Sequence, residues 1–208
     1  LGIHVDRRVT ARDLGHMALA VSVSVQAVMG ARPRWALLNL TLPEDARELG
    51  VPRERWLDEF LAGFLSLADQ HGVALVGGDT CAGPMSVTVS VLGEAGEQPL
   101  QRGGARPGDR VLVSGTLGSA ALALAELQAG RTPTPGALRR LDRPEPRLAL
   151  GRVLAGHGEP GEACRASACI DLSDGLLADL GHLATASACG AVLQLDKLQE
   201  EYIREANY

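Results

Sequence analysis

The spacing of apolar residues along the first half of the chain switches between two periods. Residues 14–29 and 57–68 carry an apolar side chain at about every third or fourth position, which is the spacing of a helix with one buried face. The runs that follow these segments are continuously apolar or alternate with polar residues, as buried and half-buried strands do. The predicted strands are 35–42, 73–76 and 85–92. Helices and strands that alternate along the chain predict an α/β fold.

Residues that cap or end helices lie at the boundaries of the predicted helices. Thr10 and Asp13 have the spacing of a capping box at the start of the first helix. Gly30 follows the last apolar residue of that helix, and Gly72 follows the second helix. These local signals agree with the apolar periodicity about where both helices end and where the first one begins.

A cluster of turn residues, GGARPGD at 103–109, interrupts the pattern near the middle of the chain. We place a domain boundary there, which gives an N-terminal domain over 1–102 and a C-terminal domain over 103–208. The second half again alternates between strand and helix patterns, with loops predicted at 130–136 and 156–167. Its predicted strands are 110–114, 168–171 and 191–195, and its predicted helices are 119–128, 146–154 and 175–186.

Composition narrows the functional class. The chain of 208 residues is 46% hydrophobic, which is typical of a globular protein, and its net charge of −5 argues against a nucleic-acid partner. No apolar run reaches the roughly 20 residues of a membrane span, and no signal peptide opens the chain. The cysteines form no C-x-x-C pair, so we expect free thiols in a reducing cytoplasm rather than a zinc site. They are Cys81, Cys164, Cys169 and Cys189.

Three aspartates stand where predicted strands end. Asp79 lies in a turn that two glycines open, Asp171 ends a strand, and Asp174 is placed as the N-cap of the next helix. Carboxylates at strand ends suit Mg²⁺, and glycines let backbone N–H groups approach an anion. The alternative is that each aspartate is only a turn or capping residue. Asp179, within the same helix, is either an exposed residue or a support for the other carboxylates.

Four stretches of the chain resemble, in order and spacing, the motifs of the thiamine-monophosphate kinase family. That family belongs to an ATP-binding superfamily that includes aminoimidazole-ribonucleotide synthetase. The resemblance covers residues 1–195. The four stretches are ALAVSVSVQAVMGARPRWALLNLTLP (18–43), VALVGGDTCAGPMSVTVSVLG (73–93), RGGARPGDRVLVSGTLGSAALAL (102–124) and IDLSDGLLADLGH (170–182).

The resemblance implies an ATP-dependent phosphorylation of thiamine monophosphate to thiamine diphosphate, with release of ADP and with Mg²⁺ as cofactor. Transfer to an anionic acceptor depends on position and charge neutralisation, which residues that gather metal ions supply. The implied fold is a two-domain, synthetase-like α/β fold, in which the N-terminal sheet pairs across a homodimer and a C-terminal α/β domain follows. The implied partners are ATP and thiamine monophosphate, without nucleic acid or membrane, in the cytoplasm. The alternating strand 85–92 also suits a dimer, because sheet edges need cover.

The resemblance also assigns roles to individual residues. Asp171 and Asp174 are implied to be catalytic. The implied metal-binding residues are Asp6, Asp79 and Asp171, and the implied nucleotide-binding residues are Gly77, Gly78, Thr80 and Asp174. These roles follow from matching motifs, and the spacing of the residues alone does not name a reaction.

Several positions depart from the family pattern. Val25 and Ser119 stand where aspartates are expected, and Ala82 stands where an arginine is expected. Part of the acceptor pocket after Asp6 is missing, as are the family's GDDAA loop and GGEDYEL segment, so the chain is incomplete at both ends relative to that family. It is a fragment, a sequence with segments left out, or a divergent member. Two functions of different classes remain open: an active kinase, or a catalytically degenerate member that serves as a nucleotide-binding or structural homodimer. A superfamily member with a different acceptor is a third alternative.

Overall fold

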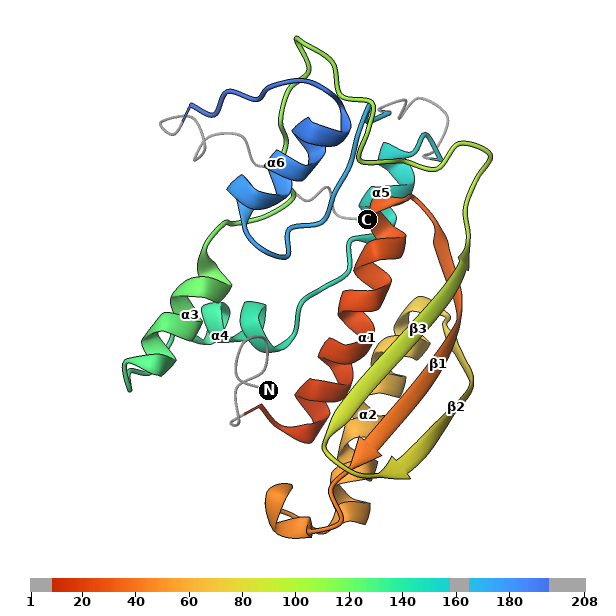
Figure 1. Cartoon of the computed structure of the whole chain (residues 1–208), viewed down its shortest axis with the longest axis vertical. Helices are drawn as coiled ribbons and strands as arrows, with labels where there is room; N and C mark the ends of the chain where they lie inside the picture. Colours follow the sequence, from red (N-terminus) through yellow and green to blue (C-terminus); the bar gives the residue numbers. More distant parts are fainter. Residues whose placement is uncertain (1–8, 158–164, 195–208) are drawn as a thin grey trace.

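The computed structural model describes residues 9–157 and 165–194, and it confirms the predicted mixed α/β class (Figure 1). Within these ranges, no helix is long and apolar enough to cross a membrane. The elements in chain order are α1 (Ala11–Val28), β1 (Arg32–Leu42), the 3-10 helix η1 (Ala46–Glu48), α2 (Arg53–His71), β2 (Ala74–Ala82), β3 (Ser86–Glu94), α3 (Ser119–Gln128), α4 (Pro135–Asp142), α5 (Leu148–Leu154) and α6 (Leu176–Ala186).

The three-stranded sheet has the order β2-β1-β3, with β1 parallel to β2 and antiparallel to β3. Helix α2 connects the two parallel strands, and α1 and α2 cover the same face of the sheet (Figure 1). From Ala36 to the end of β1, every second residue is buried beneath these helices, as the alternation of side chains along a strand requires. The buried residues include Ala36, Leu38, Leu40 and Leu42.

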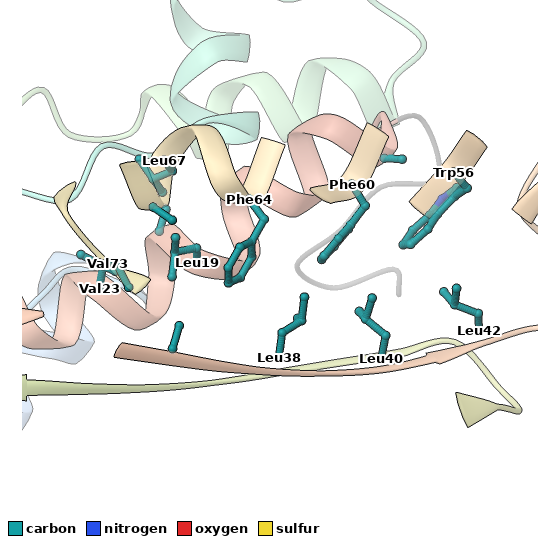
Figure 2. Packing of buried hydrophobic residues seen from close by; sticks show 14 residues of the cluster. Leu19, Val23, Leu38, Leu40, Leu42, Trp56, Phe60, Phe64, Leu67 and Val73 are labelled. Carbon is teal, nitrogen blue, oxygen red and sulfur yellow. The ribbon is translucent and has the colours of Figure 1, made fainter. Parts of the chain in front are cut away.

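Aromatic side chains of α2 fill the centre of the core between helices and sheet. Figure 2 shows three of them above three leucines of β1, namely Trp56, Phe60 and Phe64 above Leu38, Leu40 and Leu42. The ring centroids of Trp56 and Phe60 lie 5.2 Å apart, and those of Phe60 and Phe64 lie 6.4 Å apart. These spacings are typical of offset-stacked aromatic pairs, so α2 is fixed on the sheet by large, rigid side chains.

Two glycines bring α1 and α2 into close contact. A Cβ atom on Gly15 would overlap the carbonyl oxygen of Phe60, and one on Gly63 would overlap the carbonyl oxygen of Arg12. Any larger residue at these positions would push the helix backbones apart. The missing side chains therefore set how closely the two helices pack.

The predicted helix ends are confirmed. The Thr10 hydroxyl accepts a hydrogen bond from the N–H of Asp13 at 3.1 Å and donates one to the Asp13 carboxylate at 2.7 Å. Asp13 also forms an ion pair with Arg143, which ties the start of α1 to the second half of the chain. Gly72 ends α2 with φ at 64°, a left-handed conformation that glycine adopts without strain.

Helix α1 lies between the sheet and most of the second half of the chain. Figure 1 shows α3, α4 and α6 on the side of α1 that faces away from the sheet. A Cβ atom on Gly151 of α5 would overlap the carbonyl oxygen of Ala27, so α5 packs closely on the end of α1. The His16 ring lies within hydrogen-bonding distance, 3.0 Å, of the Pro144 carbonyl oxygen. The second half is therefore attached mainly through α1.

Several predictions for the second half are wrong. The segments 110–114 and 168–171 form no strand, apart from a single bridge residue at Val113, and 191–194 has no regular structure. An apolar run becomes a strand only beside a hydrogen-bonded neighbour, and among the described residues these runs have none that forms a ladder. The predicted loop 130–136 is also cut short, because Thr134 caps α4 with Pro135 as its first residue.

Candidate functional site

Asp79 lies within β2 rather than in the turn predicted after a strand. Strand β2 continues to Ala82 because its parallel partner β1 also continues, with Leu42 paired to Ala82. The register places Asn39 of β1 opposite Asp79 on one side and opposite Thr88 of β3 on the other. Since Leu38 and Leu40 point to the helices, this polar row lies on the open face of the sheet.

The Asp79 carboxylate is held by its own strand. It accepts hydrogen bonds from the N–H of Thr80 at 2.8 Å and from the Cys81 thiol at 3.3 Å. The hydrogen bond to Asp79, together with its negative charge, raises the pKa of the Cys81 thiol. The raised pKa keeps the Cys81 thiol protonated near pH 7.

The two glycines beside Asp79 shape the edge of the sheet. Gly78 has φ at 136°, and a Cβ atom there would overlap the carbonyl oxygen of Leu38, so only glycine fits this close approach of β2 to β1. Gly77, Gly78 and Thr80 border a hollow of about 500 Å³. The rest of its lining is Leu38, Leu40, Leu57, Leu61, Leu75, Val76 and Asp79. Their role in lining nucleotide phosphates remains a prediction.

Asp171 and Asp174 lie in an irregular segment that leads into α6. Asp171 does not end a strand, and Asp174 is not the N-cap, because Gly175 occupies that position with φ at 109°. Asp171 is half-buried and Asp174 is exposed. Among the described residues, neither carboxylate makes a hydrogen bond or an ion pair. Two carboxylates without a partner in the described part of the chain fit a divalent cation with oxygen ligands.

Asp179 supports this segment from within α6. Its side chain is 2% exposed, and its Oδ2 accepts hydrogen bonds from the N–H of Ser173 at 2.9 Å and of Asp174 at 3.2 Å. The sequence left open whether Asp179 is exposed or supports the other carboxylates. In the structure Asp179 is buried and supports the segment that carries them. The sequence signal for its burial was helical spacing: Asp179 lies on the same face of the helix as the apolar residues Leu176 and Leu183.

The turn cluster at the predicted domain boundary braces the same region. The N–H of Cys169 donates to the Gln101 carbonyl oxygen at 3.0 Å. The Ser187 hydroxyl accepts from the N–H groups of Gly104 and Ala105 and donates to the Arg102 carbonyl oxygen at 3.1 Å. Residues 101–105 therefore hold the chain at Cys169, before Asp171, and at Ser187, after the end of α6.

One chain does not bring all the predicted site residues together. Asp79 belongs to β2, and Figure 1 shows β2 and α6 on opposite sides of α1. In the described ranges, no group of three or more acidic, histidine or cysteine side chains is placed to hold a metal ion. Asp6 lies outside the described residues. Asp171 and Asp174 are close to each other in sequence, but in a single chain helix α1 lies between their segment and the strand that carries Asp79.

Known proteins match this chain over most of its length. The family model "AIR synthase related protein, N-terminal domain" matches residues 2–95. Thiamine-monophosphate kinase of Salmonella typhimurium is 42% identical over 193 residues, which is 89% of this chain and 54% of the relative. The Escherichia coli K12 protein of the same name is 40% identical, over 88% of this chain and 54% of its own length. The chain thus spans about half the length of these curated relatives.

Solved structures show the same similarity. The crystal structure of thiamine-monophosphate kinase from Stenotrophomonas maltophilia has a TM-score of 0.79 and 44% identity, and it is matched over 90% of this chain and 58% of its own. A structure of AaThiL complexed with AMPPCP and TMP has a TM-score of 0.78 and 31% identity, over 90% of this chain and 58% of its own. Both matches extend from the sheet through the second half.

Proposed function

We propose that the chain belongs to the thiamine-monophosphate kinase family and that the whole protein transfers the γ-phosphoryl group of ATP to thiamine monophosphate, giving thiamine diphosphate and ADP. The observation that carries the proposal is the similarity of nearly the whole chain to AaThiL, which was solved with AMPPCP and TMP. A cytoplasmic location is part of the proposal. It is supported by the free thiols of Cys81, Cys169 and Cys189, which suit a reducing compartment.

Mg²⁺ is the proposed cofactor, with Asp6, Asp79 and Asp171 as its protein ligands. When bound, the metal would neutralise charge on the ATP phosphates during transfer. Asp171 and Asp174 suit this work because their carboxylates have no hydrogen-bond or ion-pair partner within the described ranges. Asp174 would lie against the nucleotide, and Gly77, Gly78 and Thr80 would offer backbone and hydroxyl groups to its phosphates.

A homodimer is the third part of the proposal. The open face of the sheet carries apolar side chains at one end, where Trp35 is 42% and Leu92 is 51% exposed. Every residue of β2 is exposed, and β2 forms one edge of the sheet. Pairing two sheets would cover both features. We further propose that Asp79 of one copy meets Asp171 of another, since β2 and the segment before α6 lie on opposite sides of α1 in a single chain.

The alternative, a catalytically degenerate member, rests on a specific observation. Val25 replaces an expected metal ligand and is 49% exposed on α1, so a hydrophobic side chain faces solvent where a carboxylate would bind a cation. The direct test is to incubate the full-length protein with ATP, Mg²⁺ and thiamine monophosphate and to measure thiamine diphosphate. The kinase predicts product that depends on both Mg²⁺ and the acceptor, whereas the degenerate member predicts ATP binding without product.

The Val25→Asp variant separates these two functions further. If the missing ligand limits a working kinase, the added carboxylate raises the turnover rate or lowers the Mg²⁺ concentration that gives half the maximal rate. A Val25→Asn variant is the matched control, because it has a similar shape without the charge. Equal rates for the aspartate and asparagine variants would exclude Val25 from the metal site.

A further inference from the structure

Among the residues that the structure describes, Asp179 is the only one with a charged side chain that is buried. An ionised carboxylate loses much of its hydration when it is buried, so it persists only where hydrogen bonds replace the lost water. The peptide N–H groups of Ser173 and Asp174 supply these hydrogen bonds, and both donate to the same carboxylate oxygen, Oδ2. Hydrogen bonds to a charged acceptor are stronger than those to a neutral one.

The two N–H groups belong to the residues just before α6. Both residues precede the N-cap, Gly175, so their N–H groups lie outside the helix and have no backbone partner within it. Asp179 reaches back from the first turn of α6 and accepts hydrogen bonds from both. The backbone of the two residues before the helix is therefore fixed by a helix residue five or six positions later.

Among the described residues, this tie and a second hydrogen bond hold the segment that carries Asp171. On the other side, the N–H of Cys169 is bound to the Gln101 carbonyl oxygen at 3.0 Å. Asp171 and Leu172 lie between these two fixed points. Asp174 is fixed directly, because its own N–H is one of the groups that Asp179 holds.

We propose that Asp179 is a positioning residue, whose buried carboxylate fixes the backbone so that Asp171 and Asp174 present their carboxylates to metal-bound nucleotide phosphates; this rests on the proposed function. The need for such a device follows from the fold. The strand that the sequence predicted at 168–171 does not form, so no sheet ladder holds Asp171. Residues that orient metal-binding groups commonly change metal affinity or activity by about 10- to 100-fold when they are removed.

The test compares Asp179→Ala, Asp179→Asn and Leu180→Ala in the full-length protein. Leu180 is its buried neighbour in α6, 9% exposed, and makes a matched control for lost packing. Two readouts are needed: amide hydrogen exchange in a peptide that covers 171–175, and kcat and KM for ATP at fixed Mg²⁺. The first readout does not depend on activity.

Asp179→Ala is expected to speed exchange in 171–175 and to lower kcat/KM by at least about tenfold. Asp179→Asn keeps an acceptor oxygen, so its exchange rate in 171–175 and its kcat/KM are expected to lie between those of the parent and of Asp179→Ala. If the alanine variant does not fold, the asparagine variant serves as the test. Leu180→Ala is expected to lower the melting temperature while leaving exchange in 171–175 and kcat/KM near the parent values. If Asp179→Ala matches Leu180→Ala in both readouts, Asp179 is a packing residue and the proposal is overturned. If the parent protein forms no thiamine diphosphate, the proposed function fails, and the exchange data still decide whether Asp179 holds the segment.

Discussion

Asp171 and Asp174 depend on backbone placement rather than on a strand or a helix cap. Asp171 is half-buried between two tied points, and Asp174 stands one residue ahead of the true N-cap, Gly175. Their carboxylates have no hydrogen-bond or ion-pair partner within the described residues, so they are available to a cation. Such a pair is effective only if its geometry is fixed before substrate binds, because phosphoryl transfer depends on position and charge.

Asp171→Asn tests this assignment. The variant is expected to lower the rate of thiamine diphosphate formation at least about 10²-fold, as removal of a key electrostatic contact commonly does. The melting temperature should change little, because asparagine has nearly the same shape. Asp58→Asn, an exposed change on α2, is the control and should keep the parent rate. Parent activity in Asp171→Asn would return the aspartate to the role of a loop residue.

Asp109 gives a pH-dependent prediction. The Ser167 hydroxyl, at 2.6 Å, and the N–H of Arg106, at 2.8 Å, donate to its carboxylate and hold its pKa below the ordinary 3.8. A lowered pKa means that the ionised form adds stability above pH 3.8, and that this stability is lost as the pH falls through the lowered value.

Ser167→Ala should therefore melt below the parent at pH 7, and the difference should shrink as the pH falls below 3.8. Thermal melting across this pH range measures it. Ser66→Ala, an exposed change on α2, should show no such pH dependence. A Ser167→Ala deficit that stays constant from pH 7 into the acid range would contradict this account of Asp109.

At the level of elements, local signals predicted helix ends but not strand partners. Thr10 and Gly72 were correctly assigned because capping and the left-handed conformation depend on a few adjacent residues. The apolar runs 110–114 and 168–171 were wrongly assigned as strands, because a strand requires a neighbour that local sequence does not reveal. The same limit explains Asp79, whose two glycines resemble a turn until β1 is seen beside them.

The candidate site was predictable in part for the same reason. Motif matching picked out the segment that Asp179 supports, but the buried state of Asp179 depends on how α6 packs. The separation of Asp79 from Asp171 was invisible in the sequence, because it depends on α1 lying between β2 and α6. Tertiary packing, and not local propensity, decides both.

The contact between α1 and α2 gives an element-level prediction. Gly63→Ala places a Cβ against the Arg12 carbonyl oxygen and should lower the free energy of unfolding by roughly 1–3 kcal/mol, as overpacked contacts do. Gly181→Ala in α6 is the matched control, since nothing lies near its Cβ position, and it should raise stability by about 0.5–1 kcal/mol. Urea denaturation measures both. A neutral or stabilising Gly63→Ala would mean that the helices are not in the contact described.

At the level of the whole molecule, a single chain holds the proposed site in two separate places. Strand β2 carries Asp79 on one side of α1, and the segment before α6 carries Asp171 on the other. The exposed Trp35, Leu92 and β2 edge lie on the sheet, where a second copy would cover them. We therefore propose that two copies each contribute an aspartate to a shared site.

Mixing two inactive variants tests this central claim most directly. Full-length Asp79→Asn and Asp171→Asn proteins are each expected to form little thiamine diphosphate, because every site in either dimer lacks one aspartate. When the two are co-expressed, half of the dimers are mixed, and each mixed dimer has one site with both aspartates, so roughly a quarter of the parent activity should return. Light scattering on the same samples checks that they are dimers. A mixture of confirmed mixed dimers that stays as inactive as its components would contradict the shared site.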